Sequence, residues 1–229
     1  MRWRESLIAR CCRRATRRSG LVLVVAALLA LGVRAQGGRQ GDPFSPEPVE
    51  VRIGGSVYAI PRNYLLYVST AIDGKTANIV MRALWPGLEP LRPDNAYLWE
   101  RRRPERQVHI VLLARPRSGY DELRGFAQLR SVLGEPSQFG LIRYRSQFEE
   151  YYTSTELEQR TPNGLPIALK CWDYSDETKH LFEVERNCIV EYPMVDEVGL
   201  RYEFFMANLS GWREIDHAVR ALVNGFRRQ

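Results

Sequence analysis

The N-terminal segment constrains this chain more than any other feature, because it removes residues from the fold and sets the compartment in which the rest folds. An arginine-rich stretch ends at Gly20, and an apolar run of 13 residues follows from Leu21 to Val33. A membrane-spanning helix needs about 20 apolar residues, and Val33-Arg34-Ala35 has the small or branched residues of a cleavage site. We therefore expect an export signal over residues 1–35, removed before Gln36, with a retained membrane anchor as the alternative.

The arginines of the signal leave the export route open. Thr16-Arg17-Arg18-Ser19-Gly20-Leu21 resembles a twin-arginine signal, but any arginine-rich segment of an ordinary secretory signal contains paired arginines as well. No cysteine directly follows the apolar run, so the sequence lacks a lipoprotein attachment site. Either route predicts a periplasmic or secreted protein.

The formal net charge of +6 comes from the same segment. Residues 1–35 hold eight of the 33 basic residues and one of the 27 acidic ones, which leaves 25 basic and 26 acidic residues in the remainder. Binding to a nucleic-acid backbone depends on a concentrated positive field. A near-neutral body therefore argues against a nucleic-acid partner, and only an uncleaved signal would hold the chain at a membrane.

Two cysteines remain once the signal, with Cys11 and Cys12, is removed: Cys171 and Cys188. An even number of cysteines in an oxidising compartment predicts pairing. Sixteen residues separate the two, and closing a loop of that size stabilises a fold by about 3 kcal/mol on the chain-entropy model. Neither a CxxC spacing nor a pair of histidines accompanies them, so we expect a disulfide and no metal site.

The exported part divides into residues 36–48, which are rich in Gly and Pro and predict a flexible leader, and residues 49–229, which predict a single domain. The domain opens with two alternating apolar runs around Gly54-Gly55, a pair that tolerates the positive φ angles of a tight hairpin turn. The expected cross-strand pairs of this hairpin are Ile53 with Ser56, Val51 with Tyr58 and Val49 with Ile60.

Six further segments have the apolar pattern of strands: Ala77–Trp85, Val108–Ala114, Leu141–Tyr144, Pro166–Trp172, Phe182–Tyr192 and Leu200–Ala207. Within them Cys171 shares parity with Leu169, and Cys188 shares it with Val190, so both sulfurs are expected to face the core. Glu183, Glu185, Asn187 and Glu191 are expected to face the opposite side of the sheet. The polar segment 173–179 would then connect the two strands.

Two segments have helical periodicity. Gly119–Leu133 places Leu123, Phe126, Ala127, Leu129 and Leu133 on one face. Ser210 is a good N-cap for a C-terminal helix, whose apolar stripe is Trp212, Ile215, Ala218, Val219, Leu222, Val223 and Phe226. Asp216 and Arg220 are expected on its outer face as a modest ion pair. The predicted fold class is α+β: a mainly antiparallel sheet of about six to eight strands, one central helix and a C-terminal amphipathic helix packed on it.

The sequence contains no assembled catalytic or cofactor motif: GxSxG, GxxxxGK[ST], GxGxxG and HExxH are all missing. His109, His180 and His217 lie in three different settings, a strand, a hairpin tip and an outer helix face. Glu149-Glu150-Tyr151-Tyr152 places acids beside aromatic rings, but adjacent strand residues point to opposite faces, so we interpret this run as a polar-aromatic surface segment. We expect no catalytic residue, no cofactor and no metal.

Aromatic residues are the remaining positive feature, because Tyr and Trp are enriched at protein–protein hot spots. Those expected in or near loops are Tyr64, Tyr67, Tyr97, Trp99, Tyr151, Tyr152 and Tyr174. They are candidates for partner contacts, although each can equally well cap an open face of the sheet. The sequence does not select the residues that bind a partner.

The order of elements resembles that of a known class of exported proteins. After the signal come VRIGGSVYAIPRNYL (51–65), a strand that ends ALWPGLEP (83–90), the cysteine hairpin, LRYEFF (200–205) and a final helix that opens WREID (212–216). This layout is similar to small exported proteins of Gram-negative bacteria, including periplasmic immunity proteins against type VI secretion effectors. The resemblance implies a non-enzymatic protein that binds another protein and inhibits a secreted toxin; it implies no functional residue. A cell-envelope hydrolase that uses carboxylates and a small-ligand carrier are the alternatives.

The exported protein is expected to begin at Gln36 and to contain no free thiol, because Cys171 and Cys188 pair. Intact-mass measurement, with alkylation before and after reduction, tests both points: two labels are added only after reduction. A product that retains residues 1–35, or thiols that react without reduction, would contradict the prediction.

Overall fold

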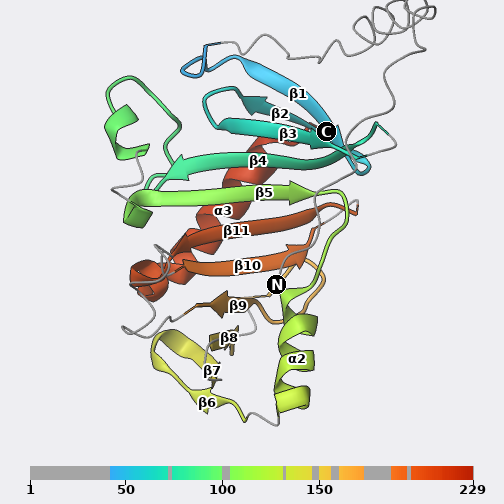
Figure 1. Cartoon of the computed structure of the whole chain (residues 1–229), viewed down its shortest axis with the longest axis vertical. Coiled ribbons are helices and arrows are strands. Elements are labelled where there is room, and N and C mark those ends of the chain that lie inside the picture. Colours follow the sequence, from blue (N-terminus) through green and yellow to red (C-terminus); the bar gives the residue numbers. More distant parts are fainter. Residues whose placement is uncertain are drawn as a thin grey trace, which may run out of the picture. The chain divides into compact units, whose positions relative to one another are not determined.

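The computed structural model describes residues 42–71, 74–99, 104–130, 133–145, 150–155, 160–172, 187–194 and 197–228. The predicted export signal, His180 and Tyr174 lie outside these residues, as do Glu149 and the segment 173–179. Figure 1 shows a nine-stranded antiparallel sheet and a separate two-stranded hairpin. No helix in the described part of the chain combines the length and the apolar character needed to cross a bilayer.

The strands, in chain order, are β1 (Pro48–Ile53), β2 (Ser56–Pro61), β3 (Leu65–Thr70), β4 (Thr76–Leu84), β5 (Gln107–Leu113), β6 (Glu135–Pro136), β7 (Leu141–Arg145), β8 (Glu150–Ser154), β9 (Ala168–Cys171), β10 (Asn187–Pro193) and β11 (Gly199–Phe205). The helices are α2 (Gly119–Arg130) and α3 (Trp212–Phe226), with short 3-10 helices η1 (Ala96–Trp99), η2 (Pro104–Arg106), η3 (Gln138–Gly140) and η4 (Met206–Gly211). The sheet order is β3-β4-β5-β11-β10-β9-β8-β7-β6. The predicted α+β class is confirmed, with more strands than expected.

The hairpin of β1 and β2 has the predicted register. Ile53 lies opposite Ser56, Val51 opposite Tyr58 and Val49 opposite Ile60, and Gly54 adopts a φ of 55°. The C-terminus closes the outer side of β2, where the Arg228 amide donates to the Val57 carbonyl at 2.8 Å. Part of the expected flexible leader is also held in place, because the Asn63 amide donates to the Ser45 carbonyl at 3.0 Å.

The nine-stranded sheet has two different faces, which follow from the alternation of side chains along each strand. On the core face lie apolar residues such as Ile110 of β5 and Val190 of β10, both completely buried, and α3 packs against this face behind the strands in Figure 1. On the second face, α2 packs over β9 and β10. The second face therefore carries the polar residues that alternate with the core.

One buried ionic group holds α3 to the sheet. Asp216 is 3% exposed; its Oδ1 accepts hydrogen bonds from the hydroxyls of Tyr192 on β10 and Tyr202 on β11, each at 2.8 Å. Arg220 donates from Nε to Asp216 Oδ2 at 2.7 Å. The prediction of an exposed, modest ion pair was wrong: Asp216 lies four residues after Trp212 and three before Val219, so it belongs to the buried stripe.

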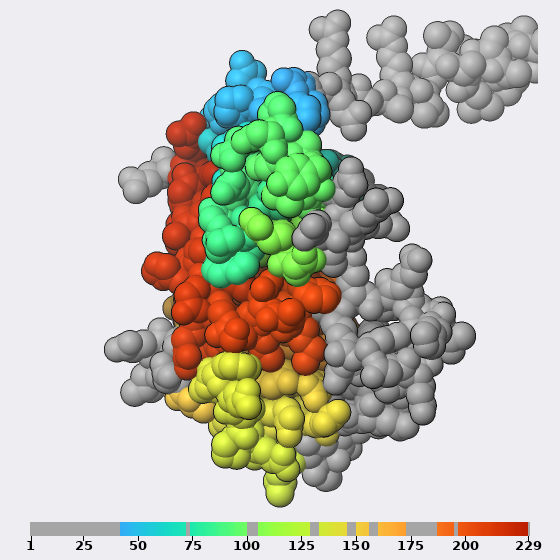
Figure 2. All heavy atoms as spheres, turned by 90° about the vertical axis from the view of Figure 1, so that its left-hand side faces the viewer, coloured from blue at the N-terminus to red at the C-terminus, as the bar shows by residue number. Residues whose placement is uncertain are grey.

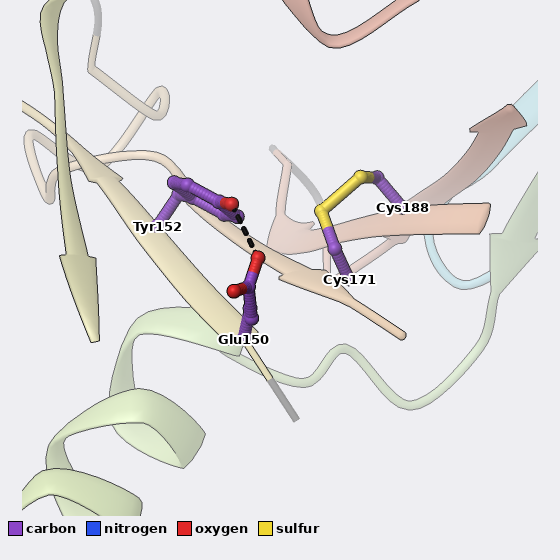
Figure 3. Close-up of a disulfide and its surroundings, with 4 residues drawn as sticks. All are labelled: Glu150, Tyr152, Cys171 and Cys188. Carbon is purple, nitrogen blue, oxygen red and sulfur yellow. Dashed lines mark hydrogen bonds between the residues drawn. A yellow bond between two sulfur atoms is a disulfide. The ribbon is translucent and has the colours of Figure 1, made fainter. Parts of the chain in front are cut away.

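The structure contains the disulfide between Cys171 and Cys188 (Figure 3). The two residues lie directly opposite each other on β9 and β10, with their Cα atoms 4.1 Å apart. Both are completely buried on the core face, as the parity of their neighbours predicts. The disulfide fixes the register between β9 and β10, two neighbouring strands of the nine-stranded sheet.

The helices differ from the predictions at their ends. Helix α2 ends at Arg130, and Leu133, expected on its apolar face, is 86% exposed. Helix α3 begins at Trp212, and its N-cap is Gly211, without a side-chain hydrogen bond. The predicted cap, Ser210, belongs instead to η4, because the chain turns through a 3-10 helix before the α-helix begins.

Three strands of the main sheet were not expected: β3, β6 and β8. The segment predicted as a polar-aromatic surface is strand β8, in which Glu150, Tyr151 and Tyr152 are 4%, 3% and 6% exposed. The prediction was wrong because hydrogen-bonding partners satisfy the polar ends of these side chains, so their rings and stems can be buried.

The loops at one end of the strands pack on each other, as Figure 2 shows for the loop that carries η1, for η4 and for the β6–β7 region. The Asn208 side-chain amide donates to the Glu105 carbonyl at 2.8 Å. The Trp212 indole donates to the Phe139 carbonyl at 3.2 Å. Asn208 thus forms a structural contact between η4 and η2.

Replacement of Asp216 by Ala is expected to lower the free energy of unfolding by about 3 kcal/mol or more, the usual cost of removing one partner from a buried ion pair. The substitution would leave two buried tyrosine hydroxyls without their acceptor and would leave Arg220 with only the Arg160 carbonyl. Asn224→Ala, on an exposed position of the same helix, serves as the control and should change stability by no more than about 0.5 kcal/mol. Urea unfolding measures both, and equal losses would contradict the prediction.

Candidate functional site

A pocket of about 210 Å³ opens on the second face of the sheet, beside the start of α2. Its lining comes from six parts of the fold: the segment before α2, α2 itself, strands β8, β9 with the residue that follows it, β10 and β11. The lining residues are Arg117, Gly119, Glu122, Tyr151, Lys170, Trp172, Ile189, Glu191 and Arg201. The pocket is the candidate functional site because charged and aromatic side chains converge there.

Strand register brings the lining residues together. Tyr151 lies opposite Lys170, and Lys170 lies opposite Ile189, so three strands contribute one continuous row. A second row begins with Glu191 opposite Arg201. All of these residues have the parity opposite to the disulfide, which places them on the face that the core does not occupy.

Gly119 lets α2 begin close to the sheet. A Cβ atom at this position would lie 3.0 Å from the Glu191 carbonyl oxygen, closer than nearly all real Cβ contacts. The absence of a side chain at the first helical residue therefore lets the start of α2 approach β10. This approach positions Glu122, one turn into the helix, over Lys170.

Glu122, Tyr151 and Lys170 form a hydrogen-bonded cluster at one side of the pocket. The Lys170 ammonium and the Tyr151 hydroxyl both donate to Glu122 Oε1, at 2.8 and 2.9 Å. The ammonium also lies 5.2 Å from the centre of the Tyr151 ring and 5.5 Å from that of Trp172, within range of cation–π attraction. Lys170 is thus held between two aromatic rings and a carboxylate.

The cluster shifts the ionisation of its members. Burial opposes the charged form of Glu122, but the hydrogen bonds from Lys170 and Tyr151 outweigh burial and lower the pKa of this carboxyl. Burial, together with the neighbouring Glu122 carboxylate, raises the pKa of the Tyr151 hydroxyl to about 12. At neutral pH the cluster therefore consists of a carboxylate, an ammonium and a neutral phenol.

The other side of the pocket is different, because its charges are not paired. Glu191 Oε1 is buried and has no hydrogen-bond donor among the described residues. Burial raises the pKa of the Glu191 carboxyl, although Arg201 and Arg117 oppose the shift. Neither guanidinium forms a hydrogen bond or a salt bridge within 4.0 Å to any residue that the structure describes.

Glu150, the other carboxylate considered from the sequence, does not line the pocket. It lies on the core face of β8, next to the disulfide in Figure 3, where the Tyr152 hydroxyl donates to its Oε2 at 2.6 Å. The Arg145 guanidinium lies 3.1 Å from its Oε1. Both oxygens of Glu150 are thus engaged in packing contacts of the sheet.

The two histidines that the structure describes do not converge on a common site. His109, on β5, is exposed and lies opposite Arg82 and Glu203 in register, and His217 is exposed on α3. In the described ranges no cluster of three or more His, Cys, Asp or Glu side chains could hold a metal ion. The site is therefore one of charged and aromatic contacts.

The aromatic residues expected in loops have separated into two groups. Trp99, Tyr151 and Tyr152 are buried, and the Tyr64 hydroxyl donates to the Leu88 carbonyl at 2.8 Å. The exposed members are Tyr67, at 58%, and Tyr97, at 65%.

Tyr67 belongs to the edge strand β3, whose pairing with β4 is irregular at two places. Strand β3 contains no charged residue and no proline, and Leu66, Tyr67 and Val68 are exposed. The opposite edge of the sheet, β6, is only two residues long and consists of Glu135 and Pro136. Short length, charge and proline protect natural edges from pairing with other chains. β3 is therefore a second place at which apolar side chains are exposed.

Comparison with solved structures gives two proteins of similar fold. One is Smlt3025, an immunity protein of the Stenotrophomonas maltophilia type IV secretion system, at 15% identity and a TM-score of 0.56; the match covers 81% of this chain and 95% of that one. The other is the Neisseria meningitidis iron-regulated outer membrane lipoprotein FrpD, at 16% identity and a TM-score of 0.51, with coverage of 79% and 98%. At these identities the likeness shows a shared fold.

Sequence comparison adds nothing to this result. No family model matches the chain, and no curated protein matches it either. The pocket residues of this chain are therefore interpreted from their own geometry.

Two isosteric substitutions in the pocket are expected to act in opposite directions. Glu122→Gln should lower stability at neutral pH by less than about 1 kcal/mol, since its ion pair with Lys170 is partly exposed. A carboxyl with a lowered pKa stabilises the fold above its unfolded pKa, and this contribution is lost as the pH falls through the folded pKa. The effect of Glu122→Gln should therefore disappear in acid.

Glu191→Gln should instead raise stability at neutral pH. A carboxyl with a raised pKa destabilises the folded state once the pH exceeds its unfolded pKa, and glutamine removes that charge. The gain should vanish in acid, where Glu191 is protonated in both states. Thermal unfolding of both variants at neutral and acidic pH measures the effects, and a shift of the same sign in both variants at neutral pH would contradict the account.

Proposed function

We propose that this chain is an exported, non-enzymatic protein of the cell envelope that binds another protein, and that this partner is a secreted toxin which it inhibits. The observation that supports the proposal most is the fold, which is similar to that of an immunity protein over 95% of that protein's length. The resemblance of the sequence to exported immunity proteins, in the order of elements and in short segments, agrees with this fold.

Two features support the proposed compartment. Residues 1–35 have the pattern of a cleavable export signal, and a buried disulfide joins Cys171 and Cys188. Structural disulfides persist in oxidising compartments such as the periplasm. We therefore propose a periplasmic or secreted protein in which residues 49–229 form the functional domain.

Protein binding is favoured over the two alternatives by the character of the site. The pocket, at about 210 Å³, is smaller than the roughly 300–1,000 Å³ of a typical small-ligand site, so a carrier is not favoured. Of the two carboxylates considered for a hydrolase, Glu149 lies outside the described residues, and Glu150 has both oxygens engaged on the core face. A pocket of this size instead suits one side chain of a partner, in the manner of an interface hot spot.

The class of secretion system is not part of the proposal. The sequence resemblance points to type VI effectors, whereas the immunity protein of similar fold belongs to a type IV system. Immunity is the element that both comparisons share, and the proposal therefore names a secreted toxin as the partner without assigning its route.

Growth protection tests the proposal directly. Candidate toxins encoded beside this gene would be directed to the periplasm of a test strain, with and without the full chain. We expect one of them to arrest growth, and the chain to restore growth and to copurify with that toxin.

The matched control is the chain without residues 1–35, which stays in the cytoplasm and should not protect. Absence of protection together with absence of a captured toxin would contradict the proposal. Protection by the cytoplasmic control alone would contradict the proposed compartment.

A further inference from the structure

We propose that the pocket beside α2 receives a carboxylate side chain, Glu or Asp, of the partner protein, and that Arg117 and Arg201 bind it. The inference rests on the proposed function for the identity of the partner, since it specifies which chemical group of that protein enters the site. The chemistry of the pocket can nevertheless be tested without the partner.

The first argument is the state of the two guanidiniums. Arg117 and Arg201 line the pocket, yet neither forms a hydrogen bond or a salt bridge with any described residue. A guanidinium carries five N–H donors in a planar fork that matches a carboxylate. Two such groups at one small pocket therefore offer more N–H donors than the described residues around it use.

The second argument is that the third cation is already committed. The Lys170 ammonium contacts Glu122 at 2.8 Å and lies between the rings of Tyr151 and Trp172. Glu122 in turn accepts a hydrogen bond from Tyr151. The cluster thus neutralises its own charge and forms a rigid wall, which leaves Arg117 and Arg201 to select the ligand.

The third argument concerns Glu191, the carboxylate nearest in register to Arg201. Although Glu191 lies opposite Arg201, the two side chains do not form a salt bridge within 4.0 Å. The two positive charges of Arg117 and Arg201 exceed the single negative charge of Glu191. An anionic ligand would therefore neutralise the positive charge that is left. Glu191 at the same time limits the affinity by like-charge repulsion.

The size of the pocket decides between a side chain and a larger ligand. A volume of about 210 Å³ falls below the usual range for small-molecule sites. Ile189 and Trp172 add an apolar lining on which the methylene groups of a side chain can pack. A carboxylate on a short aliphatic stem satisfies both parts of the lining.

The test uses two small probes that differ only in charge: N-acetyl-glutamate amide and N-acetyl-glutamine amide. Each is titrated into the mature protein while NMR signals of the Trp172 indole N–H, the Gly119 amide and the Arg201 Nε–H are recorded. We expect the glutamate probe to shift these signals in a saturable manner and the glutamine probe to bind about tenfold more weakly or worse, as loss of a charge-assisted hydrogen bond requires.

Three variants make the result specific. Arg201→Gln should weaken the glutamate probe about tenfold, whereas Arg115→Gln, on an exposed residue of the same segment as Arg117 that does not line the pocket, should leave it unchanged. Glu191→Gln should strengthen it by removing the like charge. Equal binding of both probes, no saturable shift at the highest soluble concentration, or weaker binding by Glu191→Gln would each overturn the assignment.

The partner provides the final arm once it has been captured. If Arg201→Gln weakens capture and Arg115→Gln does not, the carboxylate assignment holds for the protein partner. If Arg201→Gln captures the partner with unchanged affinity, the proposed function stands and this inference fails. If the glutamate probe binds but no partner is found, the proposed function fails and the chemistry of the pocket stands.

Discussion

The pairing of β9 with β10 is the constraint on which the rest of the structure depends, and the disulfide fixes it. Because Cys171 lies opposite Cys188 on the core face, the next position along the pair, Lys170 with Ile189, must lie on the second face. A shift of one residue between the two strands would turn Lys170 into the core if β9 moved, or Glu191 if β10 moved. The covalent link therefore determines which side chains form the pocket, although neither sulfur contributes to it.

The two faces of the sheet differ in how their charged side chains are partnered. On the core face, the buried Asp216 joins α3 to β10 and β11 through two tyrosine hydroxyls and Arg220; a buried charge of this kind is tolerated because every oxygen has donors. On the second face, Glu122 and Lys170 form an ion pair, whereas Arg117 and Arg201 form neither a hydrogen bond nor a salt bridge with any residue that the structure describes. The paired charges stabilise the fold, whereas the guanidiniums of Arg117 and Arg201 are the ones proposed to bind a partner.

The fold class, the β1–β2 register and the cysteine pairing could be predicted because each follows from local alternation and from a single possible pairing. Strand β8 could not, because its glutamate and tyrosines look solvent-exposed until their partners are known. Asp216 was misplaced because its charge was given more weight than its position on the helical stripe. The pocket was missed because its residues come from segments far apart in sequence, although the parity that directs Glu191 away from the core is visible in the sequence.

The central claim is that this chain binds a protein through the pocket that the β9–β10 register creates. Amide hydrogen exchange, measured with and without the captured partner, tests it most directly. We predict slower exchange in the complex at the start of α2 and along β9 and β10, beside Gly119, Lys170 and Glu191. Unchanged exchange in these segments, with protection confined to another surface of the domain, would contradict the claim.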